Sequence, residues 1–187
     1  MFRLLEAFLF AIAAGLALAD ETLKESPKQI TVRTLAESLG AATVKGDYPK
    51  VIDHTWDGAI ARMGGREKAI KNMETGMKKV ADKGWRIKSY KVRSVGAFHK
   101  EGDLTFCVVP TTLEVATSGS RIISKNYLLG ISKDDGATWK FVDSAVIQDE
   151  AVRKAALPPL PSSLVLPKRE KPEVIKEPSD GASAHKD

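Results

Sequence analysis

The chain contains 187 residues, 43% of them hydrophobic and 28% charged, with a formal net charge of +5 and a single cysteine. One thiol excludes an internal disulfide, and neither the cysteine nor the three histidines stand at the spacing of a metal site. The length and composition therefore predict one compact domain that is stable without disulfides or a bound metal.

The first segment of the chain predicts export. Arg3 gives a short positive start, residues 4–19 are almost wholly apolar, and Ala19 precedes Asp20 at a site that signal peptidase accepts. We therefore expect a signal peptide at residues 1–19 and a mature protein that is periplasmic or secreted. The alternative is an uncleaved membrane anchor, although the stretch is shorter than the roughly 20 apolar residues that cross a bilayer.

The next part of the chain predicts a flexible segment and then a short helix. Residues 20–33 are polar and mixed, and we expect them to form a flexible lead-in to the domain. The domain itself is expected at residues 34–156. Its first helix is predicted over 34–44, because apolar residues recur at helical spacing there and Gly46 follows as a stop.

Two longer amphipathic helices are predicted after Gly46. The first runs from Tyr48 to Met63, where Asp47 offers a side-chain cap and Pro49 suits the first turn. Its apolar stripe consists of Tyr48, Ile52, Thr55, Trp56, Ala59, Ile60 and Met63. The second is expected at residues 66–83, with its lysines on the outer face.

From Trp85 onward the apolar period changes to two, which predicts an antiparallel meander. The alternation changes phase near Lys88 and Ser89, so we expect a bulge there. Turn residues at 100–103, 117–120 and 134–136 separate the predicted strands, which cover 104–116, 121–132 and 138–147.

Two further features complete the predicted domain. Cys107 stands in a run with the composition of a buried strand, and we expect a structural role for it. One or two helical turns are predicted at 149–156. Residues 157–187 form a Pro-rich tail that we expect to be largely disordered, although residues 160–166 could lie across the domain surface.

Helices followed by a bent four-stranded meander indicate an α+β fold, with N-terminal helices packed on a curved antiparallel sheet in a cone. In the helix 48–63, the helix ending at Gly84 and the hairpin 127–143, the chain resembles the NTF2-like (cystatin-like-roll) superfamily over residues 34–147. The resemblance implies a cavity between helices and sheet and a homodimer through the outer sheet face. The superfamily holds isomerases, dehydratases and binding modules, so the fold does not select a function.

A second, local resemblance concerns one hairpin. Residues 132–139, SKDDGATW, are similar to the Asp-box of sialidase-type propellers. One copy cannot build a propeller, because such a fold repeats several blades. We therefore interpret the segment as a turn in which Asp134 accepts backbone N–H groups and Gly136 takes a positive φ.

The expected cavity defines the candidate site residues, which are His54, Trp56, Asp57, Tyr90 and Tyr127. The resemblance implies that an Asp or His could act as a base beside a tyrosine hydroxyl that stabilises an enolate-like oxyanion. The alternative is that His54 lies at the helix surface and the tyrosines pack at the domain boundary. We expect Trp56 to point toward the concave sheet and His54 to point away from it.

Charge is concentrated in one segment. Residues 62–93 carry eleven Lys and Arg against three acidic residues, which suits an anionic component of the cell envelope or simply a solvated helix and strand face. Nucleic acid is not expected, because the leader exports the protein and no aromatic residues are interleaved with the cations.

These observations order the functional hypotheses. The leading one is an exported, non-catalytic module that binds a small apolar or amphipathic ligand, or a partner, at the cell envelope. The second is an isomerase or dehydratase with an Asp or His base, and the third is binding of anionic surfaces through residues 62–93. No phosphate-binding glycine loop, nucleophile elbow or H-E-x-x-H motif occurs, so no catalytic residue, cofactor or metal is assigned.

Overall fold

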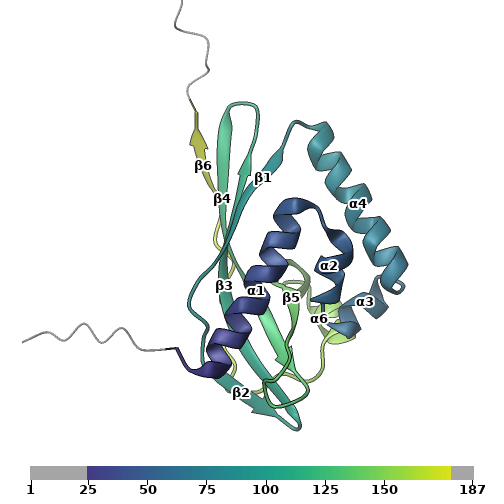
Figure 1. The fold of residues 1–187 in the computed structure, drawn as a ribbon, viewed down its shortest axis with the longest axis vertical. Coiled ribbons are helices and arrows are strands. Elements are labelled where there is room, and N and C mark those ends of the chain that lie inside the picture. The colour runs from purple at the N-terminus through teal and green to yellow at the C-terminus, as the bar shows by residue number, and fades with distance from the viewer. Residues whose placement is uncertain (1–24, 178–187) are drawn as a thin grey trace, which may run out of the picture.

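The computed structural model describes residues 25–177, and the fold is α+β, as predicted (Figure 1). The first four elements are α1 (Pro27–Lys45), α2 (Tyr48–Asp53), α3 (Asp57–Arg62) and α4 (Arg66–Asp82). The strands that follow are β1 (Arg86–Val92), β2 (Phe98–Glu101), β3 (Leu104–Ala116), β4 (Ser120–Ser132) and β5 (Lys140–Asp143). The chain continues through α5 (Ser144–Ile147), α6 (Glu150–Ala156) and β6 (Glu173–Lys176). The predicted signal peptide at 1–19 lies outside the described residues.

The sheet is antiparallel and is built around the long β3–β4 hairpin, whose register runs from Thr105 opposite Ser132 to Ala116 opposite Arg121. The main strand order is β1-β3-β4-β5. The second strand, β2, pairs with the start of β3, while β5 and β6 pair with opposite ends of β4. The predicted bulge in β1 is confirmed by a register shift between Ile87 and Ser89.

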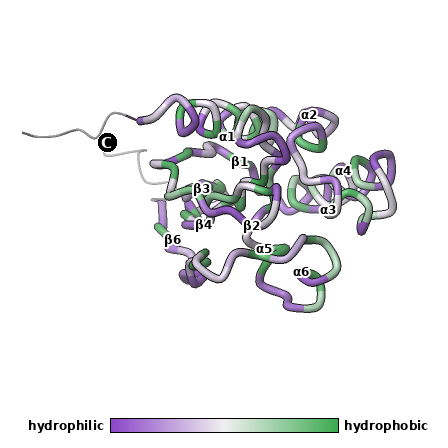
Figure 2. Tube along the Cα trace, turned by 90° about the horizontal axis from the view of Figure 1, so that it is seen from below, coloured by the Kyte–Doolittle hydropathy of each residue, from purple (hydrophilic) through white to green (hydrophobic). Residues whose placement is uncertain are grey.

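Helices and loops cover both faces of this sheet, as Figure 2 shows with α1 on one side and α5 and α6 on the other. The α1 face is the side that packs on α1, with a buried core of Val32, Ala36, Leu39, Val95, Cys107, Val109, Leu128, Trp139 and Phe141. The tail face is the opposite side, with a buried core of Trp56, Phe106, Tyr127, Leu129, Ile131, Val142 and Ile147. Cys107 is therefore structural in its packing, and burial raises its pKa to about 12.

The prediction of one helix from Tyr48 to Met63 is wrong, because the chain leaves the helix at residues 54–56. Thr55 forms a parallel bridge with Phe141 of β5. The Trp56 N–H donates to the Phe141 carbonyl at 3.0 Å, and the Phe141 N–H donates to the His54 carbonyl at 2.8 Å. These hydrogen bonds satisfy the backbone N–H and carbonyl groups of Phe141 at the edge of β5. Pairing with a distant strand therefore overrides the helical pattern of residues 48–63.

The prediction of a flexible lead-in is wrong from Pro27 onward. Ser26 and Gln29 form a reciprocal capping box, and Pro27 occupies the first turn of α1. The helix ends as expected, with Gly46 at a φ of 73°. None of the helices in the described range 25–177 is long and apolar enough to span a bilayer.

The prediction of a largely disordered tail over residues 157–187 is wrong for residues 157–177, which lie along the domain, and residues 178–187 lie outside the described residues. Leu157, Leu160, Leu164 and Leu166 pack against the tail-face core, as the sequence allowed for residues 160–166. Beyond them, β6 pairs with β4. The four leucines occupy the tail face, the side opposite α1, at which the resemblance implies a homodimer. The strand predicted over 138–147 is shorter in the structure. It ends at Asp143, because the side chain of this residue caps helix α5.

Candidate binding groove under helix α4

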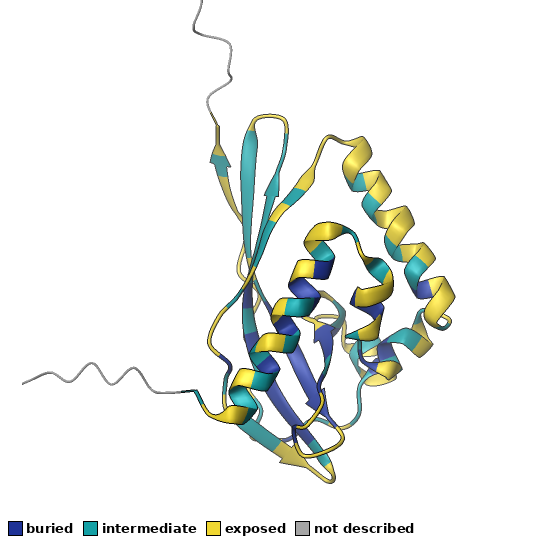
Figure 3. Cartoon of the chain, in the orientation of Figure 1, coloured by how far each residue is buried: buried dark blue, intermediate teal, exposed yellow. Residues whose placement is uncertain are grey.

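The apolar stripe of α4 is incompletely covered. Only Ala69 is buried in this helix, whereas Met73, Met77 and Val80 are half-buried. Helix α1 packs mainly on β1, and the distal part of the β3–β4 hairpin is faced by Met77 and Val80 of α4. Figure 3 shows the result: the hairpin is dark blue where α1 packs on it and teal at its distal end.

The space between α4 and the distal sheet is an apolar cavity of 280 Å³. It is lined by Met77, Val80, Trp85, Ile87, Leu113, Val115, Ile122 and Ser124. An adjoining cavity of 320 Å³ shares Met77, Trp85 and Ile87 and extends to Tyr48 and Val44 at the end of α1. We call the two cavities together the α4 groove.

Strand register explains why these side chains share one face. Val115 lies opposite both Ile87 of β1 and Ile122 of β4, and cross-strand partners point to the same side of a sheet. The bulge at Lys88 gives β1 an extra residue, so Ile87 and Tyr90 both point to the α1 face despite their three-residue spacing. The two apolar phases seen in the sequence of β1 therefore merge into one surface.

Trp85 forms a wall of the groove that is partly exposed to solvent and lies beside Lys83. Its side chain is 38% exposed, whereas Trp56 and Trp139 are only 7% and 2% exposed. The Nζ atom of Lys83 lies 5.8 Å from the centre of the Trp85 ring, within cation–π range. The groove thus combines apolar walls with positive charge at its edge, a combination that suits apolar or amphipathic molecules.

The structure separates the five candidate residues that the sequence suggested. Trp56 and Tyr127 belong to the tail face, so the Trp56 ring packs against the sheet on the side opposite α1. Tyr90 packs on the α1 face. Asp57 is exposed and pairs with Lys133 at 2.8 Å. The five side chains do not line one cavity.

His54 occupies an intermediate position at the end of α2. Its Nε2 atom lies 3.1 Å from the Ser38 hydroxyl, and its ring lines a shallow cavity beside Asp53 and Lys140. Burial, followed by the positive charges of Lys140 and Lys50, lowers the pKa of His54. Both effects favour the neutral form of the imidazole.

The tyrosine hydroxyls lack the partners that the enzymatic hypothesis needs. The Tyr90 hydroxyl is buried without a hydrogen bond, and burial raises its pKa. Burial also raises the pKa of Tyr127, with the charge of Asp143 adding to the effect. Within residues 25–177, neither hydroxyl forms a hydrogen bond with a carboxylate or an imidazole, and no three potential metal ligands gather.

The hairpin at 132–139 has the structural role that the sequence indicated. Asp134 accepts hydrogen bonds from the Thr138 N–H at 2.8 Å and the Thr138 hydroxyl at 2.6 Å. The Ser132 hydroxyl accepts from the Gly136 N–H at 2.8 Å, and Trp139 donates to the Gly136 carbonyl at 3.0 Å. Hydrogen bonds from Thr138 lower the pKa of Asp134 to about 2. Both oxygens of this carboxylate therefore accept hydrogen bonds within the turn.

Sequence reasoning missed the α4 groove, although a signal for it was present. Leu113, Val115 and Ile122 alternate regularly along their strands, so a shared face could be inferred. What the sequence did not reveal is that α1 leaves these three residues uncovered, so that they face α4 across a cavity.

The chain was also compared with known proteins. No family model, no curated protein and no solved structure matches it.

Proposed function

We propose that this protein is an exported, non-catalytic module that binds a small apolar or amphipathic ligand in the α4 groove. The observation that carries the proposal is the groove itself: seven of the eight side chains around the 280 Å³ cavity are apolar, and the cavity is open to solvent beside Trp85. The apolar leader at residues 1–19 supports export, and the order of helices and meander supports an NTF2-like architecture.

The energetic reason for binding is removal of apolar surface from water. Each Å² of apolar surface that a ligand covers contributes about 25 cal/mol. The half-buried positions of Met77, Val115 and Ile122 leave such surface available without unfolding any element. A ligand with an anionic end can place that end near Lys83 and Arg86, which lie on either side of Trp85 in the chain.

The distribution of titratable groups supports binding rather than catalysis. A general base must reach its proton at hydrogen-bonding distance, directly or through one water. Asp57 is engaged by Lys133, Asp53 by Arg66, and His54 contacts Ser38. None of these residues lines the 280 Å³ cavity, whose walls carry no acid or base.

The proposal is tested by titration with N-phenyl-naphthylamine, a neutral dye that fluoresces in apolar surroundings. Wild-type protein should bind it saturably, and Leu113→Gln should weaken binding about tenfold, because a polar amide replaces an apolar wall. Val165→Gln is the matched control, since Val165 is an exposed apolar residue of the tail, and it should bind like wild type. Circular dichroism melts establish that each variant is folded.

Non-saturable binding to folded wild-type protein would contradict the proposal. Equal affinities for wild type and Leu113→Gln would also contradict it, because the dye would then bind elsewhere.

A further inference from the structure

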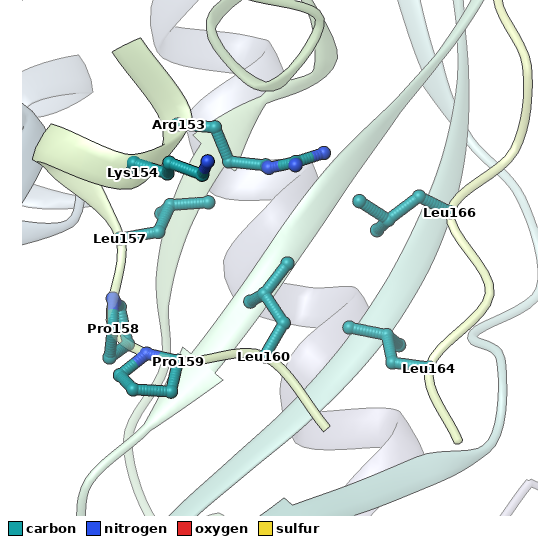
Figure 4. Close-up of a pocket in the computed structure, with 8 residues that line it drawn as sticks. All are labelled: Arg153, Lys154, Leu157, Pro158, Pro159, Leu160, Leu164 and Leu166. Carbon is teal, nitrogen blue, oxygen red and sulfur yellow. The ribbon is translucent and has the colours of Figure 1, made fainter. Parts of the chain in front are cut away.

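A second cavity lies on the tail face, separated from the α4 groove by the sheet. Its volume is 580 Å³, and its walls come from α6 and from the tail that follows it. Four leucines of the tail-face cluster, Leu157, Leu160, Leu164 and Leu166, supply the apolar surface (Figure 4). Arg153 and Lys154 of α6 stand at one side of it.

The backbone holds this cavity in place. Asp149 caps α6 by accepting from the Val152 N–H at 2.9 Å, which fixes the turn that carries Arg153. The Leu157 N–H donates to the Arg153 carbonyl at 2.9 Å, so the first leucine follows directly from the helix end. The Leu164 N–H donates to the Pro161 carbonyl at 3.0 Å and turns the chain back toward the domain.

The two cations of the cavity differ in their partners. The Nζ atom of Lys154 pairs with Glu150 at 2.7 Å. The guanidinium of Arg153 has no ion-pair partner within residues 25–177, and the residue is half-buried. Figure 4 shows the Arg153 side chain extending from α6 toward Leu166, across the opening between the leucines. A guanidinium without an ion-pair partner in the described part of the chain thus stands beside hydrocarbon walls.

We propose that this cavity binds a single-chain amphipathic anion, with its hydrocarbon chain on the leucines and its carboxylate or phosphate head group on Arg153. The planar guanidinium fork matches either head group through two parallel hydrogen bonds. The positive charge of Arg153 favours an anionic head group over a neutral or cationic one, and the four leucines favour a hydrocarbon chain. This site is independent of the α4 groove, because no residue lines both cavities.

The test is isothermal titration of the folded protein with dodecanoate, dodecyl phosphate, dodecanol and dodecyltrimethylammonium, each below its critical micelle concentration. Dodecanoate or dodecyl phosphate should bind saturably, dodecanol more weakly, and the cationic amphiphile most weakly. Arg153→Gln should weaken binding of the anions about tenfold and leave dodecanol unchanged, because only the charged hydrogen bonds to the head group are lost. Lys154→Gln is the matched control and should change anion binding less than Arg153→Gln does.

Two outcomes overturn the proposal: wild-type protein that binds neither anion saturably, or Arg153→Gln that binds both as wild type does. The comparison of dodecanoate with dodecyl phosphate identifies the preferred head group. The Leu113→Gln variant of the α4 groove should retain anion binding at this cavity, so failure at one site is distinguished from failure at the other.

Discussion

The ring of Tyr90 lies against Gly40 of α1 so closely that a side chain at position 40 has no space. A Cβ atom on Gly40 would stand 2.5 Å from Cδ1 of Tyr90. This contact lets α1 approach β1 and packs Tyr90 against the α1-face core.

Gly40→Ala should therefore destabilise the protein even though alanine favours helices. The helical preference is worth about 1 kcal/mol, whereas forcing an extra methyl group into a packed site costs about 1–3 kcal/mol. Gly76→Ala in α4 is the control, because its Cβ would meet nothing within 4 Å, and it should be stabilising. Urea denaturation measures both changes, and a stabilised Gly40→Ala would show that the packing is looser than described.

His54 should make stability depend on pH. Since its pKa is lowered in the folded state, the unfolded chain binds the proton more readily, and stability falls as pH drops below about 6.5. His54→Gln should lose less stability than wild type between about pH 7.5 and pH 5.5. Thermal melts at both pH values decide this, and identical pH dependence in the two proteins contradicts the assignment.

The carboxylate of Asp134 should stabilise the closing hairpin above its ordinary pKa of 3.8 and lose this effect as pH falls toward about 2. Asp134→Asn should thus melt below wild type at neutral pH, and the gap should narrow in acid. Asp103→Asn, in the exposed β2–β3 turn, is the control and should melt like wild type at neutral pH. The hairpin interpretation fails if Asp134→Asn melts like wild type at neutral pH.

Trp56→Ala should be strongly destabilising, because the ring is 7% exposed and belongs to the tail-face core. Deleting a buried aromatic ring costs about 3–5 kcal/mol. Trp85→Ala should cost less, since that ring is 38% exposed. Urea denaturation of both variants measures the two losses of unfolding free energy. A larger loss for Trp85→Ala than for Trp56→Ala would contradict the burial of Trp56 in the core.

Local signals predicted much of the fold. Strand β3 has the predicted bounds, the caps at Gly46 and Asp47 form, and the bulge at Lys88 is present. Each of these features depends on neighbouring residues in the chain: a left-handed glycine, a short acidic side chain or a change of alternation. Such features can be read from sequence because their physics is local.

The errors concern contacts between distant segments. The break in the helix at Thr55 depends on pairing with Phe141. Residues 157–177 adopt a defined structure because their leucines pack against the tail-face core. The predicted grouping of the candidate site residues is wrong for the same reason. Trp56 and Tyr90 lie on opposite faces of the sheet. A helical pattern gives no information about a strand edge that arrives some eighty-five residues later.

The most direct test of binding in the α4 groove uses Trp85, which is 38% exposed, while the other two tryptophans are buried. Acrylamide quenching of tryptophan fluorescence is measured with and without saturating decanol, an apolar ligand that does not absorb where tryptophan does. We predict that decanol reduces the quenching, and that Trp85→Phe abolishes this protection while the protein stays folded. Quenching of wild-type protein that is unchanged at saturation would contradict the account, because Trp85 would then be outside the binding site.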